Sequence, residues 1–236
     1  MTLKNLVRQT PLVVQVAEQF RELIASGDWP VGSRIPGEHQ LAEQLGVSRG
    51  TVREALRALS VAGLLEPRVG DGTYVRATDE ITGALVRGEL PYTLAAVLDA
   101  RAGLEAAAAR LAARSAPPEA IAALDRALTA RAATLEEGGH AGFVAADAAF
   151  HRAVVQASGN PLLLRLHEAI AAVLAQSIGD TTELPEDPRV TATHRELLEA
   201  IRSGDAERAA AAPYALIESV KDAAARLGDD GSAAGA

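Results

Sequence analysis

The sequence has 236 residues, of which 48% are hydrophobic but only 3% aromatic, with no cysteine and a formal net charge of −8. This length predicts two domains, whose cores must be built from aliphatic side chains. The absence of cysteine excludes a disulfide scaffold, a cysteine-based zinc site and a cysteine nucleophile. No stretch has the length and apolarity of a membrane-spanning helix, and the N-terminus has no signal-peptide pattern. We therefore expect a soluble, cytoplasmic protein with no membrane partner.

The charge is divided unevenly along the chain. Residues 1–76 hold nine basic and eight acidic residues, a net charge of +1, whereas the remainder holds 14 basic and 23 acidic residues, a net charge of −9. This asymmetry favours an N-terminal part that tolerates a polyanion and an acidic remainder that repels one.

The first 76 residues predict three helices followed by a hairpin. A helix is expected from about Pro11 to Ser26, and a shorter one from Glu38 to Leu45. After a Gly46-Val47 turn, Ser48 is a suitable N-cap for a third helix that ends near Ala62. Residues 64–75 place two short β-prone segments around a Gly/Asp tip, which is a hairpin pattern. This order of elements is that of a winged helix-turn-helix.

The third helix carries the pattern of a DNA-reading helix. Arg49, Arg53 and Arg57 recur every four residues and therefore share one face. Arginine at the start of such a helix can hold guanine O6 and N7 in the major groove. A solvated amphipathic helix without a ligand would show the same charges, but the flanking turn and hairpin favour DNA binding. The candidate DNA contacts are Arg34, His39, Ser48, Arg49, Gly50, Thr51, Arg53, Arg57, Arg68 and Gly70.

The candidates other than the arginines of the third helix have distinct expected roles in DNA binding. The hydroxyls of Ser48 and Thr51 can contact phosphates, and Gly50 permits a close approach to the DNA backbone. Arg68, just before the hairpin tip, is expected to reach the minor groove or a phosphate.

Residues 32–59, GSRIPGEHQLAEQLGVSRGTVREALRAL, closely resemble the DNA-binding domain of the GntR family. Two positions depart from the family pattern. Gly37 stands where the family usually has Ser or Ala, and His39 stands where many members carry a DNA-contacting Arg. The departure at His39 bears on one contact, not on the fold, and a protonated His39 could still donate to a phosphate.

The rest of the chain predicts helices only. Residues 77–90 are expected to form a linker that includes one short helical turn, and residues 227–236 a disordered tail. Between them, residues 91–226 predict a bundle of about six helices, near 91–114, 117–137, 140–157, 161–178, 187–202 and 205–226. The predicted fold class is therefore mainly α, a winged helix-turn-helix followed by an all-α bundle.

Three segments of this bundle resemble the FCD effector domain of the FadR subfamily: 98–105 (LDARAGLE), 146–151 (ADAAFH) and 194–205 (HRELLEAIRSGD). The two resemblances together cover about residues 10–220. The FCD resemblance implies an all-helical domain that forms a homodimer and binds a small metabolite, often a carboxylate. In many family members this domain also holds a divalent metal ion with one Asp and three His.

The residues themselves supply part of that metal site. Asp147 and His151 are four residues apart and point the same way from one helix, and His194 would come from a neighbouring helix. The family's fourth ligand falls at Leu216, and Pro213 is expected to kink the last helix. A divalent ion of the Zn, Ni or Mn class and a set of merely hydrogen-bonded polar residues both fit this pattern.

Arg101 is a candidate clamp for an anionic effector, because Arg binds a carboxylate with two parallel hydrogen bonds. The effector-binding set is then Arg101, Asp147, His151 and His194. The alternative for Arg101 is an intrahelical pair with Glu105, which at a solvent-exposed position is worth only ~0.3–0.5 kcal/mol. His140 and His167 are expected at the surface.

The leading hypothesis is a metabolite-responsive regulator, a repressor released from a pseudo-palindromic operator on double-stranded DNA by a small carboxylate effector. A second hypothesis is a constitutive DNA-binding protein with a degenerate sensor, consistent with Leu216 and Pro213. A third is a metalloenzyme with a two-His-one-carboxylate iron site formed by Asp147, His151 and His194. Because the sensor resemblance accounts for those three residues, an enzyme is not expected.

Overall fold

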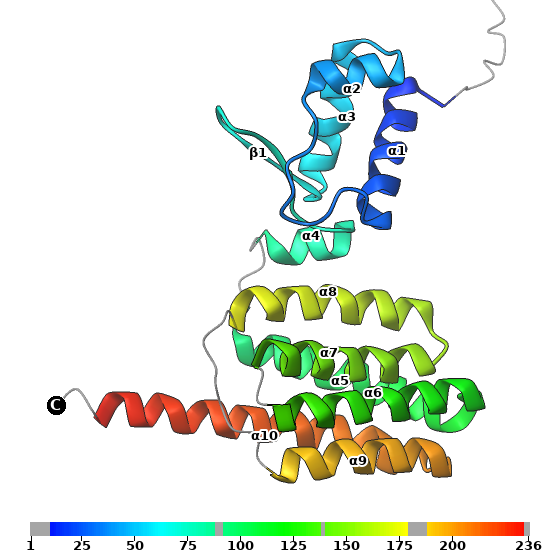
Figure 1. Ribbon diagram of the computed structural model, residues 1–236, viewed down its shortest axis with the longest axis vertical. Coiled ribbons are helices and arrows are strands. Elements are labelled where there is room, and N and C mark those ends of the chain that lie inside the picture. The colour runs from blue at the N-terminus through cyan, green and yellow to red at the C-terminus, as the bar shows by residue number, and fades with distance from the viewer. Residues whose placement is uncertain (1–9, 88–91, 138–139, 179–187, 234–236) are drawn as a thin grey trace, which may run out of the picture. The chain divides into compact units, whose positions relative to one another are not determined.

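The computed structural model describes residues 10–87, 92–137, 140–178 and 188–233 of the chain (Figure 1). The side chains of 136–137, 140–141, 176–178 and 223–233 are not described, so the surface position expected for His140 lies outside the described residues. The chain forms two units, Met1–Leu90 and Pro91–Ala236. Both are built mainly from helices, as the sequence predicted.

The N-terminal unit contains the predicted winged helix-turn-helix. Its elements are α1 (Leu12–Ser26), α2 (Glu38–Leu45), α3 (Arg49–Val61), β1 (Leu65–Arg68) and β2 (Gly72–Val75). Ser48 caps α3 by accepting a hydrogen bond from the Thr51 backbone N at 3.1 Å. The inward faces of the three helices form one core, which includes Val16, Phe20, Ile24, Val52, Leu56 and Leu59. The hairpin projects away from the helices (Figure 1).

The base of the hairpin is joined to the rest of the domain by a third extended segment. β1 and β2 pair antiparallel, with Leu65 opposite Val75 and Arg68 opposite Gly72. The chain between α1 and α2 bridges β2 through Arg34 and Tyr74, and the backbone N of Ile35 donates to the Thr73 carbonyl at 2.9 Å. This third segment makes the base of the wing a continuous part of the domain.

The segment expected to be a linker instead contains a helix, α4 (Glu80–Val86), that packs on the end of α3. An added Cβ at Gly83 would lie 2.8 Å from the Gly63 carbonyl oxygen, so the two backbones are in direct contact. Arg87 Nη1 donates to the Val61 carbonyl at 2.6 Å, which satisfies one of the last carbonyls of α3. These contacts make α4 part of the DNA-binding unit.

Replacing Gly83 by alanine should therefore destabilise this unit by about 1–3 kcal/mol, because the new methyl group must push the backbone of Gly63 away. The chain's one tryptophan, Trp29, packs at 5.2 Å (ring centroids) from Phe20 and reports unfolding of this unit by fluorescence. Gly142→Ala is the matched control, since its methyl group meets nothing closer than 3.9 Å in helix α7 (His140–Ala157). Equal denaturation midpoints for the two variants would contradict the close α3–α4 contact.

The C-terminal unit contains the six predicted helices. They are α5 (Leu94–Ser115), α6 (Pro118–Glu137), α7 (His140–Ala157), α8 (Pro161–Ile178), α9 (Pro188–Ser203) and α10 (Ala206–Ala233). α10 packs along α5 and α9, α6 packs on α7, and α5 also contacts α7 and α8. The central core is aliphatic apart from Phe150, and includes Leu124, Phe150, Val154, Leu197, Ile201 and Leu216.

The end of α10 corrects the predicted tail. The helix continues through Pro213 and runs to Ala233, whereas residues 227–236 were expected to be disordered. Each glycine in this segment costs only about 1 kcal/mol in a helix interior, and extending an existing helix needs no new nucleation. Within the described part of the chain, no helix is both long and apolar enough to cross a membrane.

Candidate functional site

The outward face of α3 carries the three arginines that the sequence singled out. Arg49, Arg53 and Arg57 are exposed, while Val52 and Leu56 on the opposite face are buried in the core. The free backbone N–H groups at the start of α3 lie on the same end as Arg49 and attract phosphate. The four-residue spacing therefore presents a row of cations to solvent at a helix that the fold leaves accessible.

Arg53 is held in place from the neighbouring helix. Its Nε lies 3.1 Å from Glu38 Oε2, and its side chain remains 58% exposed. An exposed pair of this kind contributes at most about 1 kcal/mol, so a phosphate or base can compete for the guanidinium. The other candidates in this region are exposed or, for Thr51, half-buried; they are Arg34, His39, Ser48, Gly50 and Thr51.

Two further arginines lie against the wing strand that contains Tyr74: Arg68 from β1 and Arg34 from the segment between α1 and α2. The Arg68 guanidinium lies 4.1 Å above the Tyr74 ring, and the Tyr74 hydroxyl donates to Asp71 at 2.9 Å. Arg34 packs so closely on Gly72 that an added Cβ there would lie 2.5 Å from Arg34 Nε. Gly70 is exposed at the tip. Arg34 and Arg68 therefore both make side-chain contacts at the hairpin.

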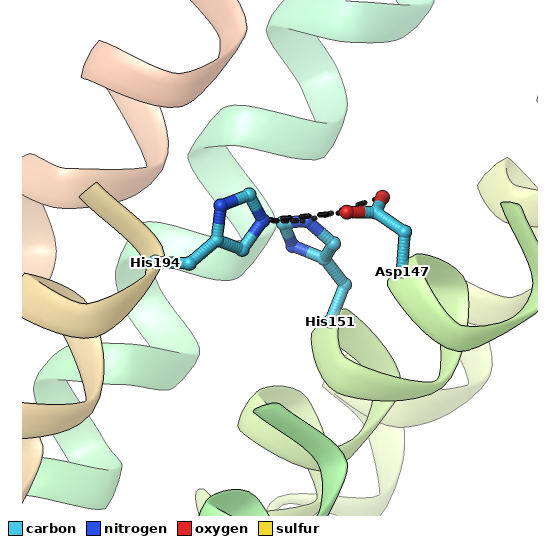
Figure 2. A group of neighbouring side chains, drawn as sticks. All are labelled: Asp147, His151 and His194. Carbon is cyan, nitrogen blue, oxygen red and sulfur yellow. Dashed lines mark hydrogen bonds and ion pairs between the residues drawn. The ribbon is translucent and has the colours of Figure 1, made fainter. Parts of the chain in front are cut away.

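A second site is buried in the C-terminal unit, where Asp147, His151 and His194 point toward one another (Figure 2). Asp147 and His151 come from successive turns of α7, and His194 comes from α9. His194 Nε2 lies 3.2 Å from His151 Nε2 and 3.4 Å from Asp147 Oδ1, and His151 Nε2 lies 3.6 Å from Asp147 Oδ2. The fold thus brings together the three ligands that the sequence predicted.

Three buried polar residues around this site were missed by the sequence analysis. They are Glu105 on α5, Arg131 on α6 and His167 on α8. Glu105 is the centre of the group, because its carboxylate accepts from His151 Nδ1 at 2.6 Å, from Arg101 Nε at 2.7 Å and from His167 Nε2 at 3.1 Å. Arg131 Nε donates to Asp147 Oδ1 at 2.6 Å.

The surface position expected for His167 is wrong. The residue is only 3% exposed, because its ring lies on the inner face of α8 and reaches Glu105. A buried imidazole needs a polar partner, and that partner comes from a helix 62 positions away in the sequence. The signal for burial was present, since Leu163 and Leu174 fall four residues before and seven after His167 on the same face.

Arg101 forms the intrahelical pair with Glu105 that was the alternative to an effector clamp. The Arg101 side chain is only 18% exposed and that of Glu105 only 1%. The pair is therefore shielded from solvent, and the small value expected for an exposed pair does not apply.

The charges of the site hold its acids ionised and one histidine neutral. Burial alone would raise the pKa of Glu105, but His151 and Arg101 hold it well below its usual range. Burial is likewise outweighed at Asp147, whose pKa is lowered, in part by the positive charge of Arg131. Burial lowers the pKa of His151, so the neutral imidazole is favoured at neutral pH despite the adjacent carboxylates.

The hydrogen bonds also fix which nitrogen of each imidazole carries the proton. His151 Nδ1 donates to Glu105, and His194 Nδ1 lies 2.7 Å from the Val190 carbonyl, which can only accept. In neutral rings both Nε2 atoms then present lone pairs to each other and to the Asp147 carboxylate. Three electron-pair donors that converge in this way can share either a proton or a metal ion.

The residues present fit a divalent metal ion. Bonds of about 2.0–2.1 Å to nitrogen and oxygen place neighbouring ligand atoms roughly 3.0–3.4 Å apart, close to the separations of 3.2–3.6 Å found here. Two His and one Asp occupy three positions. Leu216 is buried in the apolar core and supplies no ligand, so the remaining coordination positions would be open to water or to an effector.

Comparison with known proteins gives two family matches that account for most of the chain. The family described as bacterial regulatory proteins, gntR family, matches residues 12–75. The FCD domain family matches residues 96–219. The first match coincides with the winged helix-turn-helix and the second with the helical bundle that contains the histidine site.

Curated relatives align over almost the whole chain. The chain is 31% identical over 230 residues to the Putative L-lactate dehydrogenase operon regulatory protein of Escherichia coli (strain K12), covering 92% of this chain and 87% of that protein. It is 35% identical over 216 residues to the Probable D-xylose utilization operon transcriptional repressor of Paenarthrobacter nicotinovorans, covering 88% and 86%. The solved structure of E. coli McbR/YncC has a TM-score of 0.52 at 21% identity, covering 93% of this chain and 99% of that chain, and shows a shared fold.

Proposed function

We propose that this chain, which belongs to the GntR family of bacterial transcription regulators and carries an FCD domain, is a repressor that a small carboxylate effector releases from its operator. Family membership makes it a metabolite-responsive DNA-binding regulator. The two relatives above are named as regulators of metabolic operons, and one of them as a repressor. These names are those of regulators, so Asp147, His151 and His194 are not assigned to catalysis.

The observation that carries DNA binding is the exposed row of arginines on α3. Arg49 and Arg53 lie near the start of the helix that such domains insert into the major groove, and Arg68 lies in the wing. The acidic remainder of the chain would repel DNA. Binding therefore depends on these few cations and on two DNA-binding units, one from each subunit of a dimer, that contact the DNA at the same time. A homodimer with two-fold symmetry then reads a pseudo-palindromic operator.

The buried site of the FCD domain is the proposed sensor. Asp147, His151 and His194 would hold a divalent ion of the Zn, Ni or Mn class. When bound, the ion supplies a Lewis-acidic centre with open positions that suit a carboxylate. Glu105 keeps the His151 lone pair aimed at the ion, and Arg101 contributes positive charge at the edge of the same network.

A gel-shift experiment on the full-length protein tests the proposed function. The DNA is operator selected from the source genome by affinity capture, and carboxylate metabolites are added one at a time with the metal-loaded protein. We expect binding in the nanomolar range that one class of carboxylate weakens at least tenfold. The absence of sequence-specific binding at low salt would contradict the proposal. DNA binding that no metabolite alters would instead support the alternative of a constitutive DNA-binding protein with a degenerate sensor.

Asp147→Asn tests the metal site directly. Removing the charged ligand should weaken zinc binding by about a hundredfold and abolish the rise in melting temperature that zinc gives to the wild-type protein. Asp125→Asn is the matched control, because Asp125 is an exposed aspartate paired with Arg202 on the same domain. If both variants bind zinc as tightly as the wild type, the proposed ligands do not hold the metal.

A further inference from the structure

We propose that Tyr74 is a positioning residue for DNA binding, which holds Arg68 on the same face of the wing as Arg34 so that the two guanidinium groups bind a phosphate of the DNA backbone. The wing is the hairpin of β1 and β2. This inference rests on the proposed function, and it names the group that the wing contacts and the residue that prepares the contact. The sequence leaves open whether Arg68 reaches the minor groove or a phosphate, and the geometry of the wing favours the phosphate.

Both arginines lie on one face of the wing. Tyr74 is opposite Arg34 in the third extended segment, and Gly72, two residues earlier on β2, is opposite Arg68. Residues that are directly opposite in an antiparallel pair point to the same face, and so do residues two apart on one strand. An added Cβ at Gly72 would lie 2.5 Å from Arg34 Nε, so the Arg34 side chain occupies the space that glycine leaves empty. The fold therefore brings two positive charges onto one surface.

The ring of Tyr74 supports Arg68. The Arg68 guanidinium lies over the ring, 4.1 Å from its centroid, as in a cation–π contact. The far end of the ring is anchored, because the Tyr74 hydroxyl donates to Asp71 Oδ2 at 2.9 Å. This hydrogen bond raises the pKa of Tyr74, so the hydroxyl keeps its proton and remains a donor. A guanidinium that already rests on a fixed ring loses less conformational freedom when it binds a phosphate.

A phosphate can displace the acid that pairs with Arg68. Glu66 Oε2 lies 3.6 Å from Arg68 Nη2, and the two side chains are 42% and 50% exposed. An exposed pair at this distance is weak, whereas a phosphate can accept two parallel hydrogen bonds from one guanidinium. Arg34 is also exposed. Both guanidinium groups are therefore accessible to the DNA backbone.

The position of Arg68 favours a phosphate over a base edge. The exposed tip of the wing consists of Val69, Gly70 and Asp71, whereas Arg68 lies back from the tip over the ring of Tyr74. A phosphate contact carries no sequence information. Loss of Arg68 should therefore weaken binding to all operator sequences alike and reduce the salt dependence of binding. Loss of a minor-groove contact would instead change the preferred sequence.

The experiment measures affinity of the full-length protein by fluorescence anisotropy, for the operator and for operators with single base changes, between 50 and 200 mM salt. Arg68→Gln should weaken binding about thirtyfold for every sequence and lower the slope of log affinity against log salt by about one for each wing. Tyr74→Leu should weaken binding about tenfold, whereas Tyr74→Phe keeps the ring and should stay within about threefold of the wild type. The double variant Arg68→Gln/Tyr74→Leu should bind as Arg68→Gln does, because the ring acts through Arg68.

Arg202→Gln is the control, because Arg202 is an exposed arginine of the other unit and should change neither affinity nor salt slope. Trp29 fluorescence reports whether each variant is folded. An unchanged salt slope or an altered sequence preference in Arg68→Gln would overturn the inference, as would a further loss of affinity when Tyr74→Leu is added to Arg68→Gln. Should Tyr74→Leu not fold, Tyr74→Val removes the ring with a residue suited to a strand. Failure of the proposed function is a separate result, since the wild type itself would then show no sequence-specific binding.

Discussion

Replacing Arg53 by glutamate is expected to abolish operator binding while the protein remains folded. Arg53 is exposed on the outward face of α3, and its pair with Glu38 is weak enough for DNA to displace. Loss of one arginine contact costs about 1–3 kcal/mol, and the reversed charge adds repulsion from the phosphates. If the protein binds as the proposed homodimer, both DNA-binding units lose this contact, and the expected loss in affinity is roughly a thousandfold.

Fluorescence anisotropy with labelled operator DNA measures this effect, and Trp29 fluorescence reports whether the DNA-binding unit is intact. Arg202→Glu is the matched control, since Arg202 is an exposed arginine paired with acids in the other unit. It should bind DNA as the wild type does. If Arg53→Glu retains operator affinity within a fewfold of the wild type, α3 is not the reading helix.

Replacing Glu105 by glutamine is expected to cause the largest loss of stability in the C-terminal unit. The substitution keeps the shape of the side chain but leaves the Arg101 guanidinium largely buried without its counter-charge. Breaking a buried pair in this way costs about 3–5 kcal/mol, a large part of the stability of a typical domain. Glu207→Gln is the control, because it breaks the exposed Arg110–Glu207 pair and should cost less than about 1 kcal/mol.

The pH dependence of this loss identifies the charge as its cause. The pKa of Glu105 is held well below its unfolded value, so ionised Glu105 stabilises the fold above about pH 4.3 and this contribution is lost as the pH falls further. The difference between wild type and Glu105→Gln, measured by urea denaturation, should therefore shrink as the pH drops below about 4. A difference that does not change with pH would attribute the loss to packing instead.

The lowered pKa of His151 should also make the folded protein less stable as the pH falls. His151 is held neutral by burial, so the unfolded chain takes up a proton near pH 6.5 that the folded chain does not. Stability of the C-terminal unit should therefore fall as the pH drops through this range. The wild-type denaturation midpoint at pH 7 and at pH 5.5 measures this fall, and a rise at the lower pH would contradict it.

Much of the DNA-binding unit was predictable because its signals are local. Ser48 as an N-cap, the four-residue repeat of arginines on α3 and the Gly-rich tip between β1 and β2 each depend on residues within one or two turns. The helix α4 was predicted only as a possible turn. Its position depends on the contact of Gly83 with Gly63, twenty positions earlier, which no local pattern encodes.

In the C-terminal unit, the sequence identified the three residues of the proposed metal site but not the buried polar residues that surround them. Asp147 and His151 share a helix, so their spacing alone aligns them. Arg131, Glu105 and His167 lie on three other helices, and apart from the Arg101–Glu105 pair their neighbours in sequence do not indicate what they bind. Their roles follow from helix packing, which removes water and leaves each charge only the partners that other helices bring.

Local sequence was thus sufficient for the winged helix-turn-helix, its row of arginines and the order of the helices, because each depends on periodicity and caps. Tertiary packing decided the rest. It placed Glu105 against His151 and Arg101, brought the Nε2 atoms of His151 and His194 close to Asp147, and set Arg131 on that same carboxylate. The energy of a buried charge depends on the partners that the fold places within hydrogen-bonding distance of it. Here those partners lie up to 62 residues apart in the sequence.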